Sequence, residues 1–71
     1  MKLNAKQKKY LIEIVEQCNE KYELNNAFYN KLDLHHDNLE RLGKRHELLY
    51  SEMDIFLTDH WNATKFTNYQ F

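Results

Sequence analysis

The sequence predicts an all-α protein, and three observations support this prediction. The 71-residue chain contains no proline and only one glycine, Gly43, although these two residues are the usual markers of turns and sheets. Apolar residues recur at alternating steps of three and four over most of the chain, which is the spacing of a buried helix face. The expected architecture is therefore a few long helices joined by few turns.

The first helix is expected over residues 5–29. Asn4 is a suitable N-cap, and Gln7 stands three residues later, where a capping box places its second partner. A bend at Asn25 and Asn26 is an alternative, because asparagine favours helix caps. The apolar stripe that would form the buried face consists of Leu11, Val15, Cys18, Tyr22, Asn25, Tyr29 and Leu32.

Residues 30–37 are expected to connect the first helix to the second. This segment holds most of the cap-forming side chains of the chain, including Asn30, Asp33 and Asp37, and such side chains favour helix starts. The apolar stripe is also interrupted here. A break within this segment is therefore predicted.

The second helix is expected over residues 38–61, with an aromatic tail over 62–71. Its stripe consists of Leu39, Leu42, His46, Leu49, Met53, Phe56 and His60. The helix is predicted to continue through Gly43, because a glycine within a helix costs about 1 kcal/mol relative to alanine. A new helix starting at Lys44 would also lack a capping side chain, at a similar cost.

Two long antiparallel helices share only one seam, yet both predicted stripes are wider than a single seam. The flanking residues expected to stay partly exposed are Ile12, Ile14, Phe28, Leu48, Ile55 and Leu57. We therefore expect the hairpin to dimerise into a four-helix bundle. A monomeric three-helix bundle is the alternative. The residues predicted to form the core or the dimer seam are Leu11, Val15, Tyr22, Leu39, Leu42, Leu49, Met53 and Phe56.

Composition limits the class of protein. The length suits a single helical domain over residues 1–71, and the net charge of −1 gives no general attraction to nucleic acid. No apolar run approaches the roughly 20 residues of a membrane span. The absence of a secretion signal and the single cysteine favour the cytoplasm. A lysine- and asparagine-rich composition is typical of AT-rich genes, including those of phages and mobile elements.

No catalytic, metal or cofactor motif is present, so we expect a protein that is not an enzyme. The four histidines, His35, His36, His46 and His60, do not form the close spacings of zinc or iron sites. Cys18 lies on the apolar stripe and is expected to be a buried side chain rather than a nucleophile. No metal or cofactor is therefore predicted.

Two resemblances define alternative functions. The segment from Leu49 to Leu57 resembles the second-helix signature of small helical-hairpin phosphatases that act on bacterial response regulators, although that family spaces its serine and aspartate four apart, whereas Ser51 and Asp54 are three apart. The segment 38–49 resembles a helix-turn-helix with Gly43 in the turn. Its recognition helix would carry several carboxylates, which have the wrong sign for DNA.

The tail is rich in aromatic residues: Trp61, Phe66, Tyr69 and Phe71 fall within the last eleven positions. One interpretation is that these rings fold back over the helix ends. The other is that they anchor a partner protein, since aromatic residues dominate interface hot spots. The function expected from the sequence is a small regulator or inhibitor that binds another protein of unknown identity through its helices and tail.

Overall fold

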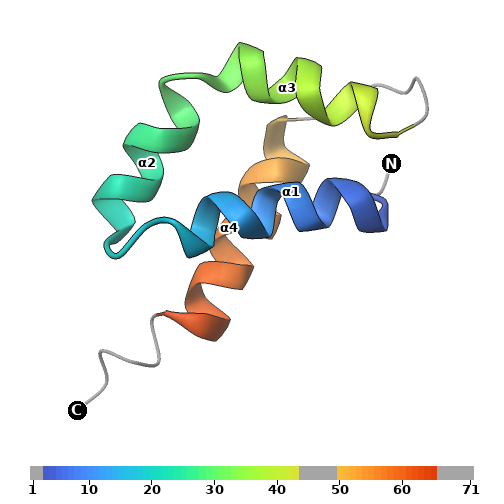
Figure 1. The fold of residues 1–71 in the computed structure, drawn as a ribbon. Helices are drawn as coiled ribbons and strands as arrows, with labels where there is room; N and C mark the ends of the chain where they lie inside the picture. The colour runs from blue at the N-terminus through green and yellow to red at the C-terminus, as the bar shows by residue number, and fades with distance from the viewer. Residues whose placement is uncertain (1–2, 44–49, 66–71) are drawn as a thin grey trace.

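The computed structural model describes residues 3–43 and 50–65. These residues form helices and no strand, which confirms the all-α class. Instead of two or three helices, they form four: α1 (Ala5–Glu16), α2 (Lys21–Tyr29), α3 (Leu32–Arg41) and α4 (Tyr50–Thr64) (Figure 1). None of these helices combines the length and the apolar character needed to span a bilayer.

The helices are arranged around α1. In Figure 1, α3 runs beside α1 in the opposite direction, and α2 joins the two at one end. The last helix, α4, crosses behind α1 and makes the most extensive contact between any two helices of the described chain. The four described helices are therefore not arranged as the predicted single hairpin.

The start of α1 is as predicted. The backbone N–H of Gln7 donates to Asn4 Oδ1 at 2.8 Å, and the backbone N–H of Asn4 donates to Gln7 Oε1 at 2.8 Å. These two bonds form a complete capping box. The local sequence signal was sufficient for this helix start.

The predicted first helix over 5–29 is wrong, because residues 17–20 interrupt it. A new helix begins after Glu20, where Glu23 Oε1 accepts from the backbone N–H groups of Asn19 and Glu20 at 2.6 and 3.2 Å. A continuous helix would also have placed the carboxylates of Glu16 and Glu20 one turn apart, which is unfavourable. The alternative bend at residues 25–26 is also wrong, since both lie inside α2.

The predicted connection over 30–37 and the helix through Gly43 also differ from the structure. Only residues 30–31 separate α2 from α3, and α3 ends at Arg41, with Leu42 as its C-cap. The capping box of α1 occupies the space beside Gly43, where an added Cβ atom would lie 2.6 Å from Gln7 Nε2 and 2.7 Å from Asn4 Nδ2. At the other end, α4 continues to Thr64, three residues beyond the prediction.

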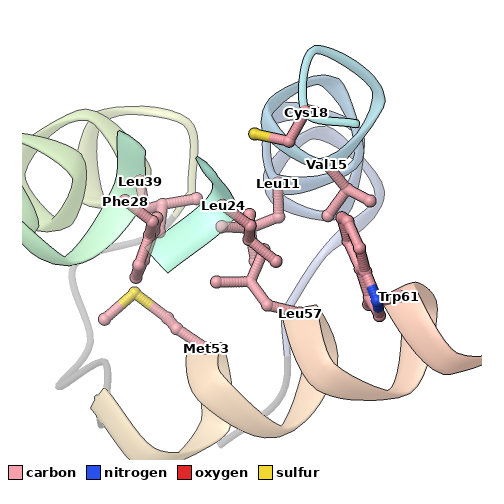
Figure 2. Packing of buried hydrophobic residues seen from close by; sticks show 9 residues of the cluster. All are labelled: Leu11, Val15, Cys18, Leu24, Phe28, Leu39, Met53, Leu57 and Trp61. Carbon is pink, nitrogen blue, oxygen red and sulfur yellow. The ribbon is translucent and has the colours of Figure 1, made fainter. Parts of the chain in front are cut away.

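One hydrophobic core joins all four helices (Figure 2). In this core Trp61 points toward Val15, and Met53 points toward Phe28 (Figure 2). Because α2 starts with a new helical phase, its buried residues are Leu24 and Phe28 rather than Tyr22 and Tyr29. The complete set is Leu11, Val15, Cys18, Leu24, Phe28, Leu39, Met53, Leu57 and Trp61.

Several flanks that the hairpin would expose are sheltered by this fold. Phe28 is 0% and Leu57 is 1% exposed, whereas Ile12 and Ile14 are half-buried. Ile55 is exposed, and Leu48 lies outside the described residues. A single chain thus covers part of the apolar surface from which the homodimer was predicted, and the dimer stays a prediction.

Candidate functional site

A row of polar side chains fastens the start of α1 to the end of α3. Gln7 Nε2 donates to the Leu39 carbonyl at 2.8 Å, and Asn4 Nδ2 donates to the Leu42 carbonyl at 3.2 Å. Carbonyls in the last turn of a helix lack their usual partner four residues on, and the Leu39 carbonyl has only a 3.2 Å bond from the Leu42 N–H within its own segment. The capping box of α1 therefore also satisfies the C-terminal end of α3, and we call this row, continued by Tyr10, the polar ladder.

The third rung of the polar ladder joins three helices. The Tyr10 hydroxyl lies 2.6 Å from His35 Nδ1, and Asn38 Nδ2 donates to the same hydroxyl at 3.0 Å. The other ring nitrogen of His35, Nε2, lies 3.1 Å from the Ala27 carbonyl. The imidazole also stacks on Phe28, with ring centroids 5.0 Å apart and planes at 5°.

Sequence reasoning did not assign a role to Tyr10, His35 or Asn38. The only signal was the spacing of three between Asn4, Gln7 and Tyr10, which places them near one face of a helix. This spacing does not reveal which element they face. The partners became visible only when α3 was placed antiparallel to α1.

Two tyrosine–aspartate pairs tie α4 to the junction of α2 and α3. The Tyr29 hydroxyl donates to Asp54 Oδ1, and the Tyr50 hydroxyl donates to Asp33 Oδ1 at 3.2 Å. Partial burial raises the pKa of Tyr29 well above its usual range, and the neighbouring Asp54 carboxylate adds to the shift through its hydrogen bond and its charge. Both hydroxyls are therefore neutral donors at physiological pH.

Trp61, one of the predicted partner anchors, lies in the core and is 4% exposed. The ammonium groups of Lys21 and Lys65 lie 5.8 and 5.7 Å from its ring centroid, within the range of cation–π attraction. Lys65 Nζ also donates to the Cys18 carbonyl at 2.8 Å. The other three predicted anchors, Phe66, Tyr69 and Phe71, lie outside the described residues.

The environment of Cys18 does not activate its thiol. Its side chain is 3% exposed, and Sγ donates to the Ile14 carbonyl at 3.2 Å. Burial raises the pKa of the Cys18 thiol, Glu23 raises it further, and Lys65 acts in the opposite direction. A protonated, buried thiol is a poor nucleophile.

On α3, His36, Asp37 and Glu40 present ligand-type atoms within 4.8 Å of one another. His36 Nδ1 lies 3.9 Å from Glu40 Oε1, at the (i, i+4) spacing of an ordinary helix pair. The Asp37 side chain is exposed, and the other two are half-buried. This is the arrangement of a solvated charged face, and we assign no metal to it.

The described residues among those predicted for the core or dimer seam are divided between three environments. Leu11, Val15, Leu39 and Met53 are fully buried in the core, whereas Leu42 and Phe56 are half-buried. Tyr22 is 71% exposed, because the break at 17–20 turns it outward. Leu49 lies outside the described residues.

Five large apolar side chains are exposed in the described chain. Tyr22 and Tyr29 lie seven positions apart and so share a face of α2, while the others lie on α3 and α4. We call them the exposed apolar set: Tyr22 (71%), Ile55 (58%), Leu34 (51%), Tyr50 (47%) and Tyr29 (38%).

The fold and these contacts define a small all-α protein whose polar groups are used to join its helices. The chain matches no protein-family model, no curated protein and no solved structure.

Proposed function

We propose that this protein is a non-catalytic binding module, a small regulator or inhibitor that acts by occupying a surface of another protein. The observation that carries the proposal is the exposed apolar set, in which three of the five side chains are tyrosines. Tyrosine is enriched among the residues that dominate binding energy at interfaces. Its ring supplies apolar contact area and its hydroxyl supplies a hydrogen bond.

Two of these tyrosines are held in place before a partner arrives. The hydroxyls of Tyr29 and Tyr50 donate to Asp54 and Asp33, each on a different helix from its tyrosine. A side chain that is already ordered loses less conformational entropy on binding. Tyr29 and Tyr50 are therefore suited to act as rigid anchors, with Tyr22 as the most accessible ring.

The two alternative functions find less support. In a DNA-binding protein of the helix-turn-helix type, the outer surface of α4 would face phosphates, yet Asp54 and Asp59 are exposed there. In the phosphatase alternative, Asp54 would act with Ser51, but its carboxylate already accepts a hydrogen bond from the Tyr29 hydroxyl. Salt-sensitive binding to duplex DNA would support the DNA-binding alternative. A phosphatase activity that is lost in a folded Ser51→Ala variant would support the phosphatase alternative.

Affinity capture with the tagged full-length chain tests the proposal. The bait is used as the wild type, as Tyr22→Ser, as Ile55→Ser and as the control Asn26→Ser, which changes an exposed polar residue on α2. A genuine partner is enriched by the wild type and the control, and the loss of an anchor weakens its binding about tenfold or more. Equal enrichment by all four baits refutes this surface, and no enrichment over bare beads counts against a protein partner.

The predicted homodimer has a separate test. A second copy that buries the exposed apolar set would give a dimer in sedimentation equilibrium at micromolar concentration, and Ile55→Lys would shift it to monomer. A wild-type chain that stays monomeric at the highest soluble concentration removes the homodimer and leaves the exposed apolar set available to a different protein.

A further inference from the structure

For a neutral His35 ring, the surrounding hydrogen bonds allow one assignment of donors and acceptors. A carbonyl can only accept, so His35 Nε2, which lies 3.1 Å from the Ala27 carbonyl, must carry a hydrogen and donate it. In a neutral imidazole Nδ1 is then without hydrogen, and it accepts the hydroxyl proton of Tyr10 at 2.6 Å. The Tyr10 oxygen in turn accepts from Asn38 Nδ2 at 3.0 Å.

We propose that His35 is an acid-sensitive fastener, whose bond from Tyr10 holds α3 to α1 only while the ring is neutral. A protonated imidazole donates from both nitrogens and accepts at neither. Nδ1 would then present a hydrogen to a Tyr10 oxygen that already receives one from Asn38. The Tyr10 hydroxyl would lose Nδ1 as its acceptor and would have to turn its hydrogen away from the ring, so the bond between Tyr10 and His35 would reverse its direction.

The groups around the ring compensate a cation only in part. From α1 the titratable group is Tyr10, and Lys6, Lys9 and Glu13 border the same surface hollow as its side chain. From α2 the ring meets the Ala27 carbonyl and the face of Phe28, and that face gives a cation partial compensation. Because of this compensation, the expected effect is the size of one hydrogen bond rather than two.

No ion pair joins His35 to a carboxylate within residues 3–43 and 50–65, and this distinguishes it from two other histidines. His36 lies 3.9 Å from Glu40, and His60 lies 3.7 Å from Glu16. At His35, by contrast, a positive charge on the ring would meet no carboxylate of the described chain.

Loss of this fastener would loosen the first half of α3. The end of α3 keeps its bonds from Asn4 and Gln7, and Leu39 keeps its place in the core. The first half, by contrast, would lose its bond from Tyr10, and the ring that stacks on Phe28 would be free to move away. Acid would therefore begin to uncover the core at Phe28 before the whole chain unfolds.

Urea unfolding at about pH 7.5 and about pH 5 tests the proposal, with wild type, His35→Gln and the control His36→Gln. Glutamine places an amide N–H near the position of Nε2 but does not titrate. On acidification the unfolding constant of the wild type should rise about fivefold relative to His35→Gln, which is the factor for one hydrogen bond. His36→Gln should keep this acid sensitivity. Parallel pH dependence of wild type and His35→Gln overturns the proposal.

A second measurement needs no variant. Long-range ¹H–¹⁵N correlation of the imidazole rings at neutral pH should show His35 with hydrogen on Nε2 and none on Nδ1. Amide exchange protection in the first half of α3 should fall about fivefold between the two pH values, while that of α4 changes little. A His35 ring with hydrogen on Nδ1, or uniform protection loss across all helices, refutes the proposal even if His35→Gln does not fold.

Discussion

Replacing Gly43 with alanine would distinguish a helix that continues through Gly43 from the observed α3, which ends at Arg41. The two arrangements predict opposite changes in the stability of the protein. If the helix ran through Gly43, alanine would stabilise the protein by about 1 kcal/mol, because glycine is the poorer helix former. In the structure, a Cβ atom at this position would lie 2.6 Å from Gln7 Nε2 and 2.7 Å from Asn4 Nδ2. Such distances require one of the groups to move.

The expected cost comes from hydrogen bonds rather than from the steric contact itself. Both amides end flexible side chains and can shift, but Gln7 is 2% exposed and its Nε2 donates to the Leu39 carbonyl. Leaving these buried groups unpaired costs about 1–3 kcal/mol, and the exposed bond from Asn4 adds roughly 0.5 kcal/mol. Alanine recovers about 0.4–1 kcal/mol by restricting the unfolded chain. The net destabilisation is about 0.5–3 kcal/mol.

Urea titration followed by far-ultraviolet circular dichroism measures this change, and a double-mutant cycle with Gln7→Ala identifies its cause. Once Gln7 is removed, the added methyl group of Gly43→Ala has space and most of its penalty should disappear. A change of about 1.5 kcal/mol would lower the melting temperature of a domain this size by roughly 6–12 °C. A Gly43→Ala variant more stable than wild type would refute the proposed packing of α1 against α3.

Three further predictions concern other parts of the fold. Phe28→Ala removes a fully buried ring and should lower the free energy of unfolding by about 3–5 kcal/mol in the same titration; a loss below 1 kcal/mol would contradict its position in the core. The raised pKa of Tyr29 means that the fold favours its neutral form, so its contribution is complete below about pH 10 and is lost as the pH rises further. The wild type should therefore lose stability more steeply than Tyr29→Phe in alkaline urea titrations, and parallel curves would contradict this. Lys65→Met removes the donor to the Cys18 carbonyl and should speed alkylation of the Cys18 thiol about threefold to tenfold. An unchanged alkylation rate would show that this bond does not stabilise the connection over residues 17–20.

The parts of the fold that sequence predicts well are those with a local physical cause. The capping box of Asn4 and Gln7 depends on two side chains three residues apart, and both bonds are present. The burial of Leu11 and Val15 on α1 follows from helical spacing. In each case all the necessary partners lie within one or two helical turns of the chain.

The breaks between helices depended on weaker local signals. At residues 17–20 the helix ends without glycine or proline, and the N-cap of α2 is Glu20 rather than the preferred residue type at Asn19, with Glu23 as its partner. This four-residue interruption changes the helical phase. It therefore exchanges Tyr22 and Tyr29 for Leu24 and Phe28 in the core and places tyrosines on the surface. One missed turn thus altered the predicted core.

The end of α3 could not be predicted from its own residues, because the groups that end it belong to α1. Propensity alone favoured continuation through Gly43, but it did not include a competitor for the last carbonyls of the helix. In the folded chain, Gln7 and Asn4 take the carbonyls of Leu39 and Leu42 while they cap their own helix. The capping box is therefore at once a local start signal and a tertiary stop signal. The Gln7→Glu variant separates the two roles, because it keeps the acceptor for the Asn4 N–H but loses the donor to the Leu39 carbonyl. This variant should weaken the attachment of α3 to α1 while leaving the start of α1 intact.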